Sequence, residues 1–383
     1  MNIAIASLAS LASFASFASF ASVVSAQTLE SRIQARLDSL KAAAPFPGLT
    51  VGIALPDGRT IALATGQSDT TRDTPMDPRA RMMAGSVGKT FFAALAIQLV
   101  REGRLDLDAP IARWLGNEPW FDSLPNARQI TVRHLMNHTS GLVRYEFNNA
   151  FLADLTSAPM RRFTPVEELR YLFGTAAQFQ PGQGWDYSDT NYIVLAMILE
   201  RILGRTAYGE IAARFTGPLG LRNTVPSDTA CIQGLIQGYA GQPNPFGGSD
   251  AMVADDGCFR INPQFEWGGG GYVSSSEDLA RWLKAYYEGL ASDTALRSQV
   301  VNGVLAPMLG QNTRYGLGVI IRNTPNGLTW GHSGFFPGYL TEVRYFPEHR
   351  FAIALMVNTS VGRSLGRGPG AIINDIAGIL LNR

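Results

Sequence analysis

Lysine is nearly absent from this chain of 383 residues. Among its 32 lysines and arginines only Lys41, Lys89 and Lys284 are lysine. Arginine stays protonated in proteins, whereas lysine can be tuned to lose its proton. In a chain that uses arginine for almost every cation, a lysine inside a motif indicates a position that arginine cannot fill. Lys89 is the candidate for such a position.

The chain also has almost no net charge. Charged residues make up 16% of the chain, the formal net charge is +1, and there are no runs of basic residues. Domains that bind nucleic acid usually carry a basic patch or stripe. We therefore expect no nucleic-acid partner.

Long apolar runs are absent after the first 26 residues. Residues 1–26 carry no charged side chain and end in Val24-Ser25-Ala26. An apolar run that ends in small residues is typical of a secretory signal peptide. We predict a signal peptide over residues 1–26, a secreted or periplasmic protein, and no membrane span after cleavage. Because no Lys or Arg precedes the run, an uncleaved membrane anchor is the alternative.

Cysteine is scarce as well, with Cys231 and Cys258 the two in the chain. In an exported protein such a pair can close a disulfide, which would stabilise the fold by roughly 3–4 kcal/mol. Two separately buried thiols are the alternative. Neither cysteine has neighbours that indicate a nucleophile.

Ser86 and Lys89 form an S-x-x-K motif. Residues three apart on a helix share a face, so the two side chains can touch. A lysine can accept the serine proton if burial or a nearby cation lowers its pKa from about 10.4. The motif alone is not specific, but Tyr187-Ser188-Asp189 and His332-Ser333-Gly334 follow it along the chain.

These three motifs, in this order and at these separations, resemble those of the serine β-lactamase and penicillin-binding protein superfamily. The chain looks like the class C β-lactamase-related branch, which includes D-alanyl-D-alanine carboxypeptidases and β-lactamase-like carboxylesterases. The resemblance extends from about residue 45 to 360, through residues 103–110, 130–142, 187–192, 268–282 and 315–318.

The resemblance implies an α/β fold of the α+β type: an antiparallel sheet flanked by helices, with an inserted all-helical region. We accordingly expect a sheet-and-helix domain formed by residues 27–78 and 268–383. A mainly helical region, residues 79–267, would carry Ser86 and the residues around it.

Hydrophobic periodicity and turn residues agree with this layout. They predict helices near residues 28–44, 90–101, 279–290 and 369–382. They predict strands near residues 48–55, 59–66, 315–321, 327–332, 339–346 and 351–357. Ser275-Ser276-Glu277-Asp278 has the pattern of a capping box at a helix start.

The resemblance also assigns roles. Ser86 would be the nucleophile, and Lys89 and Tyr187 are the two candidate bases, between which the sequence does not decide. The oxyanion hole would use the backbone N–H groups of Ser86 and Phe335. The remaining residues expected to contact substrate are Asp189, His332, Ser333 and Gly334.

Two positions depart from the superfamily pattern. Asp189 stands where the family usually has Asn, and an ionised Asp accepts but cannot donate a hydrogen bond. It should hold Lys89 protonated, which favours Tyr187 as the base. His332 stands where efficient β-lactamases have Lys. With an unperturbed pKa near 6.5, it would offer a substrate carboxylate a positive charge mainly at lower pH or beside Asp189.

Two further patterns are set aside. His134 and His138 are four apart on a predicted helix, a spacing that can bind zinc, but no Glu lies between them and no third ligand is visible. The run Gly268–Gly271 lacks the Lys-Ser/Thr of a P-loop and is interpreted as a tight backbone passage beside the cleft. We expect no metal and no organic cofactor.

The sequence therefore predicts an exported active-site serine hydrolase that acts through an acyl-enzyme on Ser86. The favoured activity is D-alanyl-D-alanine carboxypeptidase-like or that of a related peptidase or amidase. A carboxylesterase for short acyl esters, a β-lactamase and a non-turnover penicillin-binding sensor are the alternatives. The expected partner is a small molecule or peptide: a cell-wall stem peptide, an acyl ester or a β-lactam. No pattern indicates an oligomeric state.

Overall fold

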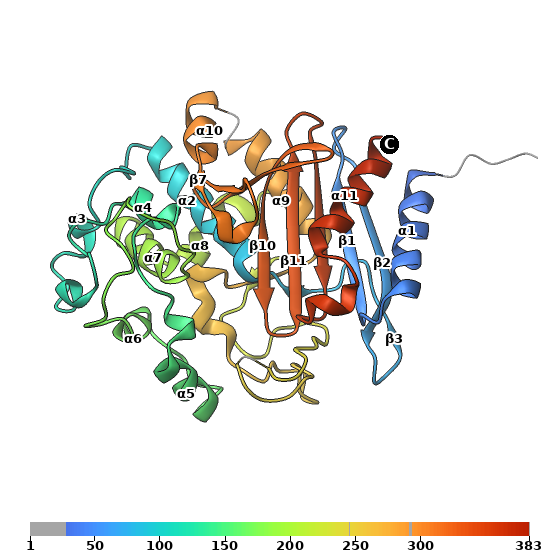
Figure 1. Ribbon diagram of the computed structural model, residues 1–383, viewed down its shortest axis with the longest axis horizontal. Coiled ribbons are helices and arrows are strands. Elements are labelled where there is room, and N and C mark those ends of the chain that lie inside the picture. The colour runs from blue at the N-terminus through green and yellow to red at the C-terminus, as the bar shows by residue number, and fades with distance from the viewer. Residues whose placement is uncertain (1–27, 245, 291–292, 383) are drawn as a thin grey trace, which may run out of the picture.

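The computed structural model describes residues 28–244, 246–290 and 293–382. It has a mixed α/β architecture around one large antiparallel sheet flanked by helices, as predicted (Figure 1). The predicted signal peptide, residues 1–26, lies outside the described residues. Of the helices in the described part, none combines the length and apolar character needed to cross a membrane.

Nine strands of the described residues form the large sheet, in the order β3-β2-β1-β12-β11-β10-β9-β8-β7. The strands of its first half are β1 (Gly48–Ala54), β2 (Thr60–Asp69), β3 (Thr74–Pro75), β12 (Phe351–Val357) and β11 (Tyr339–Phe346). The second half comprises β10 (Gly327–Phe336), β9 (Ile320–Thr324), β8 (Arg314–Tyr315) and β7 (Val304–Leu305). Every residue of β1 and β12 is buried, which requires cover on both faces of the sheet.

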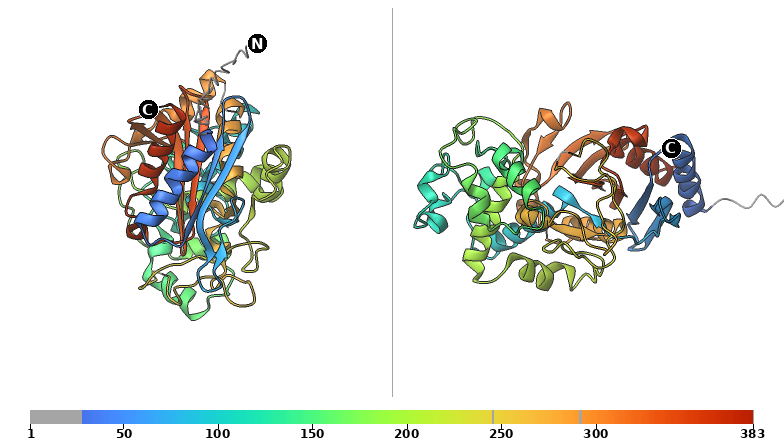
Figure 2. Two further views of the ribbon diagram at one scale, coloured as in Figure 1. Left: turned by 90° about the vertical axis from the view of Figure 1, so that its right-hand side faces the viewer. Right: turned by 90° about the horizontal axis from the view of Figure 1, so that it is seen from below.

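Helices provide this cover (Figure 2). One face packs against α1 (Leu29–Ala43) and α11 (Pro369–Leu380), and the other against α9 (Ser276–Glu288). The core beneath α1 and α11 is smaller than the core on the opposite face of the sheet. The larger core runs from the opposite face of the sheet, past α9, into the helical region without interruption. Sheet and helical region are therefore packed on one another.

The helical region is built around α2 and α7, which are buried along most of their length. Its helices are α2 (Lys89–Arg101), α3 (Ala112–Leu115), α4 (Val132–Met136), α5 (Asn149–Ser157), α6 (Pro165–Arg170), α7 (Thr190–Leu203) and α8 (Ala207–Ile211). An all-helical insertion was expected, but it also contains β4 (Met82–Met83) and β5 (Val225–Pro226), which pair with β6 (Tyr272–Ser274). A further helix, α10 (Thr294–Val301), precedes β7.

Most predicted elements are confirmed, with end shifts of a few residues: helices α1, α2, α9 and α11, and strands β1, β2, β10, β11 and β12. The single strand predicted over residues 315–321 is wrong. Gly318 adopts a positive φ of 73° and its N–H donates to the carbonyl of Met136 at 3.1 Å. The chain therefore turns towards α4 between β8 and β9.

The predicted capping box at α9 is half formed. The Ser275 hydroxyl accepts from the Asp278 N–H at 3.3 Å, as expected of an N-cap residue. The Asp278 carboxylate instead accepts from the Asn223 N–H at 2.8 Å and the Thr224 hydroxyl at 3.2 Å. It thereby connects α9 to the loop before β5.

Cys231 and Cys258 are joined by a disulfide. The bond lies in the segment from residue 217 to 262, whose described residues form no helix. It links two stretches of irregular chain that have few ladder hydrogen bonds of their own.

The contact between β1 and α9 generates a stability prediction. A Cβ atom on Gly52 would lie 2.1 Å from the backbone carbonyl oxygen of Ser276. Because a backbone atom cannot rotate away, Gly52→Ala should push α9 off the sheet and lower the free energy of unfolding by about 1–3 kcal/mol. Thermal denaturation measures this. Gly368→Ala is the control, since no atom lies within 4 Å of that Cβ position; equal melting temperatures for both variants would contradict the close packing.

Candidate active site

Ser86 lies in a single 3₁₀ turn, η1 (Gly85–Gly88), that leads directly into α2. Ser86 is partly exposed, whereas Lys89, nearly one turn later, is fully buried. The Nζ atom of Lys89 donates a hydrogen bond to the Oγ atom of Ser86 at 3.0 Å. The contact that the S-x-x-K spacing predicts is therefore present.

The Lys89 side chain donates three hydrogen bonds, to Ser86 Oγ, Asp189 Oδ1 and the carbonyl oxygen of Gly269. An ammonium group has three N–H donors, so each one has an acceptor. The acceptors come from η1, from the residue before α7, and from η5 (Pro263–Gly269). This arrangement holds a protonated lysine beneath Ser86.

The glycine run at residues 268–271 brings the third acceptor into place. A Cβ on Gly88 would lie 2.2 Å from the Gly270 carbonyl oxygen, and one on Gly268 would lie 2.4 Å from that of Tyr192. The preceding residue, Trp267, has a positive φ of 28°, which is rare for a bulky residue. The run is a tight backbone passage beside α2 and α7, as interpreted from the sequence.

Tyr187 lies against Lys89, with its ring centroid 4.9 Å from Nζ. Burial and then the negative charge of Asp189 raise the pKa of Tyr187 well above its usual range, and the Ser86 hydroxyl and Arg144 offset this only in part. Tyr187 is therefore a neutral phenol, which argues against the expectation that it is the base. The main reason is burial, which disfavours the charged phenolate, and the negative charge of Asp189 adds to this effect.

His332 is 1% exposed and hydrogen-bonded on both ring nitrogens. Its Nδ1 atom lies 2.7 Å from the Ser333 carbonyl oxygen, which can only accept, and its Nε2 atom lies 2.8 Å from the Tyr315 hydroxyl. Burial, followed by the charge of Lys89, lowers the pKa of His332 to about 3. The expectation that His332 offers a positive charge to a substrate carboxylate is wrong.

The Ser333 hydroxyl bonds to Glu342 and not to a residue of the expected active site. Its Oγ atom donates to Glu342 Oε2 at 2.6 Å on the neighbouring strand β11. Arg322 and Arg344 hold the other oxygen of that carboxylate at 3.1 and 2.9 Å. Successive side chains of a strand point to opposite faces, so Ser333 points away from the face that His332 occupies. The structure thus commits the Ser333 hydroxyl to Glu342, and it does not place this group with Ser86, Lys89 and Tyr187.

The backbone of β10 meets η1 at Gly334 and Phe335. A Cβ on Gly85, whose φ is +53°, would lie 2.7 Å from the Phe335 nitrogen, and one on Gly334 would lie 2.0 Å from the Ala84 carbonyl oxygen. Two glycines therefore let the strand approach the turn that carries Ser86. The use of the Ser86 and Phe335 N–H groups as oxyanion donors stays a prediction.

Arg144 and Glu146 belong to the site although the sequence analysis missed them. Arg144 Nη2 lies 3.0 Å from Asp189 Oδ2, and Arg144 Nε lies 2.5 Å from Glu146 Oε1. Glu146 is in the turn η3 (Tyr145–Phe147). The sequence does offer one indication of their role, because the oppositely charged Arg144 and Glu146 closely follow the family-like stretch 130–142. No spacing rule, however, connects them to a residue more than forty positions later.

His138 also supports the site, in a role different from zinc binding. Its Nδ1 atom accepts from the Ser188 N–H at 3.2 Å, and its ring centroid lies 4.3 Å from that of Tyr187. The helix expected to carry both histidines ends at Met136, and His138 has a positive φ of 62°. Among the residues that the structure describes, no group of three His, Cys, Asp or Glu could hold a metal ion.

Burial decides which groups of the site are charged. Burial raises the pKa of Asp189, but the charge of Lys89, the neighbouring Glu146 carboxyl and the charge of Arg144 outweigh burial and lower this pKa well below its usual range. Burial, then Asp189, raises the pKa of Glu146 well above its usual range. Burial also raises the pKa of Glu266 to about 8. The Asp189 carboxylate is therefore ionised and lies between two cations, Lys89 and Arg144.

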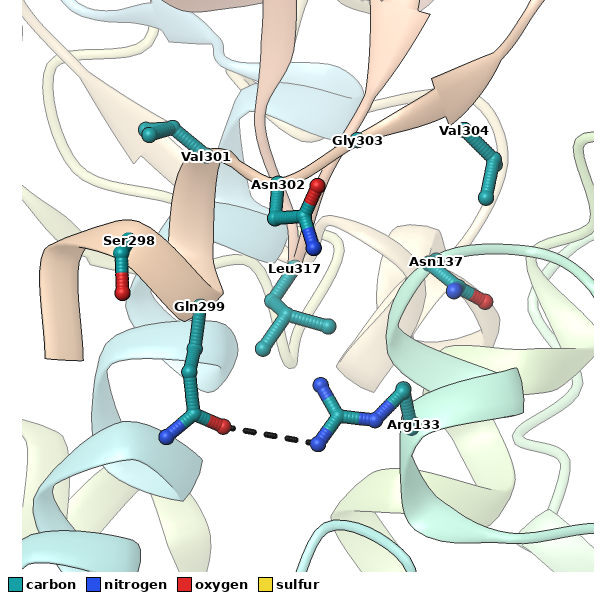
Figure 3. Close-up of a pocket in the computed structure, with 9 residues that line it drawn as sticks. All are labelled: Arg133, Asn137, Ser298, Gln299, Val301, Asn302, Gly303, Val304 and Leu317. Atoms are coloured by element: carbon teal, nitrogen blue, oxygen red, sulfur yellow. Dashed lines mark hydrogen bonds between the residues drawn. The ribbon is translucent and has the colours of Figure 1, made fainter. Parts of the chain in front are cut away.

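A separate cavity of about 750 Å³ lies between α4, α10 and β7 (Figure 3). Arg133 and Gln299 face each other across it, with a 3.4 Å hydrogen bond, and Asn137, Asn302 and Leu317 also line it. None of the residues expected at the active site lines this cavity. The chemistry described above lies elsewhere in the molecule.

Comparison with known proteins adds independent evidence. Residues 30–375 match the Beta-lactamase family. Penicillin-binding protein 4* of Bacillus subtilis (strain 168) is 27% identical over 76% of this chain, which spans 64% of that protein's length. Esterase EstB of Burkholderia gladioli is 25% identical over 90% of this chain and 94% of its own. The structure of D-amino acid amidase from Ochrobactrum anthropi SV3 complexed with L-phenylalanine amide has a TM-score of 0.77 and 25% identity, covering 92% of this chain and 99% of that one.

The state of His332 can be tested by titration. Its pKa in the folded protein, about 3, lies below the value near 6.5 of an unfolded chain. The unfolded chain therefore binds the proton more tightly, and folding stability is lost as pH falls from about 6.5 towards 3. NMR should show a neutral imidazole at pH 5, assigned by its absence in His332→Gln. The fall in melting temperature from pH 7 to 4 should be smaller in that variant than in the wild type. Titration of the assigned signal near 6.5 would contradict the buried, hydrogen-bonded state.

Proposed function

Because this chain is a serine hydrolase of the Beta-lactamase family, we propose that Ser86 is its acylated nucleophile and that it cleaves peptides or amides of D-amino acids. The observation that carries the proposal is the Lys89 ammonium, which joins Ser86 to Asp189 and Gly269 in the fully buried floor of the site. Few structural roles require a buried lysine beside a partly exposed serine.

The proposed reaction forms an acyl-enzyme. In the reactive form Lys89 has released a proton to solvent, and its amine takes the Ser86 proton while Oγ bonds to the carbonyl carbon. The backbone N–H groups of Ser86 and Phe335 stabilise the oxyanion. The raised pKa of Tyr187 keeps it a neutral phenol, suited to protonate the leaving group, after which Lys89 returns a proton to Tyr187. Water then releases the acyl group and restores Ser86.

The neutral state of His332 supports a substrate without a carboxylate next to the third motif. A buried imidazole with a pKa of about 3 offers no cation at physiological pH. Amides of D-amino acids satisfy this condition, and the Ochrobactrum anthropi amidase has a similar fold over nearly its whole length. D-Alanyl-D-alanine peptides of the cell wall stay within the proposed substrate class and would need another group to bind their terminal carboxylate.

A carboxylesterase for short acyl esters is the second candidate. Two observations favour it: the chain spans 94% of esterase EstB, and the neutral His332 suits an uncharged ester. The same Ser86, Lys89 and Tyr187 would act on it.

We also propose that the protein is exported. Two features of the chain support this. The apolar segment 1–26 ends in Val24-Ser25-Ala26, and Cys231 and Cys258 form a disulfide, a bond that persists in oxidising compartments. A mature protein that begins at Gln27 is the expected product, and mass spectrometry of the secreted chain measures it.

Substitutions at the two motif residues test the catalytic assignment. Ser86→Ala and Lys89→Arg should each lower turnover of D-alanine amide and N-acyl-D-alanyl-D-alanine about a thousandfold or more, because each removes a group that acts in the bond-forming step. Intact mass after a short penicillin pulse should show an adduct on the wild type and none on Ser86→Ala. Lys284→Arg is the matched control, since Lys284 pairs with Glu288 at 2.5 Å, away from the site.

The same assay separates the candidate substrates. D-Alanine amide should be cleaved at least tenfold faster than its L enantiomer, and p-nitrophenyl butyrate reports esterase activity. Rapid ester turnover with no cleavage of either D substrate would favour the second candidate. Full activity in Lys89→Arg would contradict the role given to Lys89.

A further inference from the structure

Arg144 makes an ion pair on the far side of the Asp189 carboxylate. Asp189 uses Oδ1 for Lys89 and Oδ2 for Arg144, the latter at 3.0 Å. An Asp directly before a helix usually caps it with its side chain, but Asp189 makes no such hydrogen bond to α7. Its carboxylate is used entirely between two cations.

Packing fixes the Arg144 guanidinium in this position. Its Cζ atom lies 4.3 Å from the ring centroid of Phe147 and 5.4 Å from that of Tyr187. Arginine stacks favourably on aromatic faces, and its planar fork presents donors in fixed directions. Arg144 therefore contacts both the ring of Tyr187 and the Asp189 carboxylate, which is hydrogen-bonded to Lys89.

Glu146 completes this arrangement. It is 5% exposed, and Arg144 Nε donates to its Oε1 atom at 2.5 Å. Burial and the nearby Asp189 charge raise the pKa of Glu146 well above its usual range. Arg144 is thus held between Glu146, which bonds its Nε atom, and Asp189, which bonds its Nη2 atom.

We propose that Arg144 and Glu146 are positioning residues, which draw the charge of Asp189 towards Oδ2 and so allow Lys89 to release a proton during acylation. The inference rests on the proposed function, because it concerns the base that activates Ser86. It also gives a reason for Asp189 in place of the usual Asn. An Asp here would hold the lysine's proton too firmly unless a second cation shared its charge.

Other charged and titratable groups around Lys89 stay the same when Arg144 is changed. Apart from Asp189, Arg144 and Glu146, they are Tyr187 before α7, Tyr192 on α7, Glu266 on η5, His138 after α4 and His332 on β10. Tyr315 on β8 is hydrogen-bonded to His332. Of these, Glu266, His138 and His332 are neutral at pH 7, because burial raises the pKa of the acid and lowers the pKa of each imidazole. Arg144 is therefore the cation that competes with Lys89 for Asp189.

The experiment is the pH dependence of Ser86 acylation in full-length mature protein, followed as the burst with p-nitrophenyl acetate and as adduct mass. In Arg144→Met the whole Asp189 charge faces Lys89, so the midpoint of the pH–rate profile should rise by about one unit and acylation at pH 7 should fall about tenfold. Adding Asp189→Asn to Arg144→Met should return the midpoint towards the wild-type value. A merely structural role for Arg144 would lower the rate at every pH without moving the midpoint.

Arg161→Met is the matched control. Arg161 also stacks on a phenylalanine, with Cζ 4.5 Å from the Phe163 centroid, and pairs with Asp154 and Glu167 at 3.5 and 3.1 Å, away from Lys89. The midpoint of the pH–rate profile of Arg161→Met should match that of the wild type. Arg144→Lys keeps the positive charge but lacks the planar guanidinium. The midpoint of its pH–rate profile should lie between those of the wild type and Arg144→Met. If Arg144→Met does not fold, Arg144→Lys provides the test.

The outcomes separate the two proposals. No adduct on Ser86 in the wild type would refute the proposed function. An adduct together with an unchanged midpoint in folded Arg144→Met or Arg144→Lys would overturn the role of Arg144 and leave the proposed function standing. A raised midpoint that Asp189→Asn does not reverse would also overturn it, since the effect would not then pass through Asp189.

Discussion

The site depends on the three hydrogen bonds of the Lys89 ammonium. They tie the turn that carries Ser86 to the start of α7 through Asp189 and to the glycine run through the Gly269 carbonyl. A fully buried ammonium is costly unless each of its protons has an acceptor and a negative charge lies close by. This requirement constrains the geometry of three chain segments that lie up to 180 residues apart in sequence.

Burial also determines which neighbours of Lys89 carry charge. Asp189 remains ionised because it lies between Lys89 and Arg144, whereas burial keeps Glu266, His138 and His332 neutral at pH 7. His332 is the clearest case, since both its ring nitrogens are bonded inside the protein and burial lowers its pKa to about 3. Two cations, Lys89 and Arg144, therefore lie on either oxygen of the Asp189 carboxylate.

Close backbone approaches make this arrangement possible. Gly85 and Gly334 let β10 approach η1, and Gly88 and Gly270 let the chain at the end of η5 approach the same turn. At each of these contacts a side chain would meet a backbone atom. Ser86 is therefore held between the sheet and the helical region, which share one continuous core.

The sequence by itself determined the features that follow from local pattern and spacing: most of the strands and helices, the Ser86–Lys89 contact, and the resemblance that points to Tyr187. Local propensity and helical periodicity act over a few residues, so they can be read from the chain. Only the tertiary structure decided the charge states and the long-range partners. Arg144 meets Asp189, Ser333 turns to Glu342, and His332 loses its proton, because burial and the choice of neighbour depend on which distant segments pack together. The broken strand at residues 315–321 has the same cause, since Gly318 turns the chain to bond Met136 in another part of the fold.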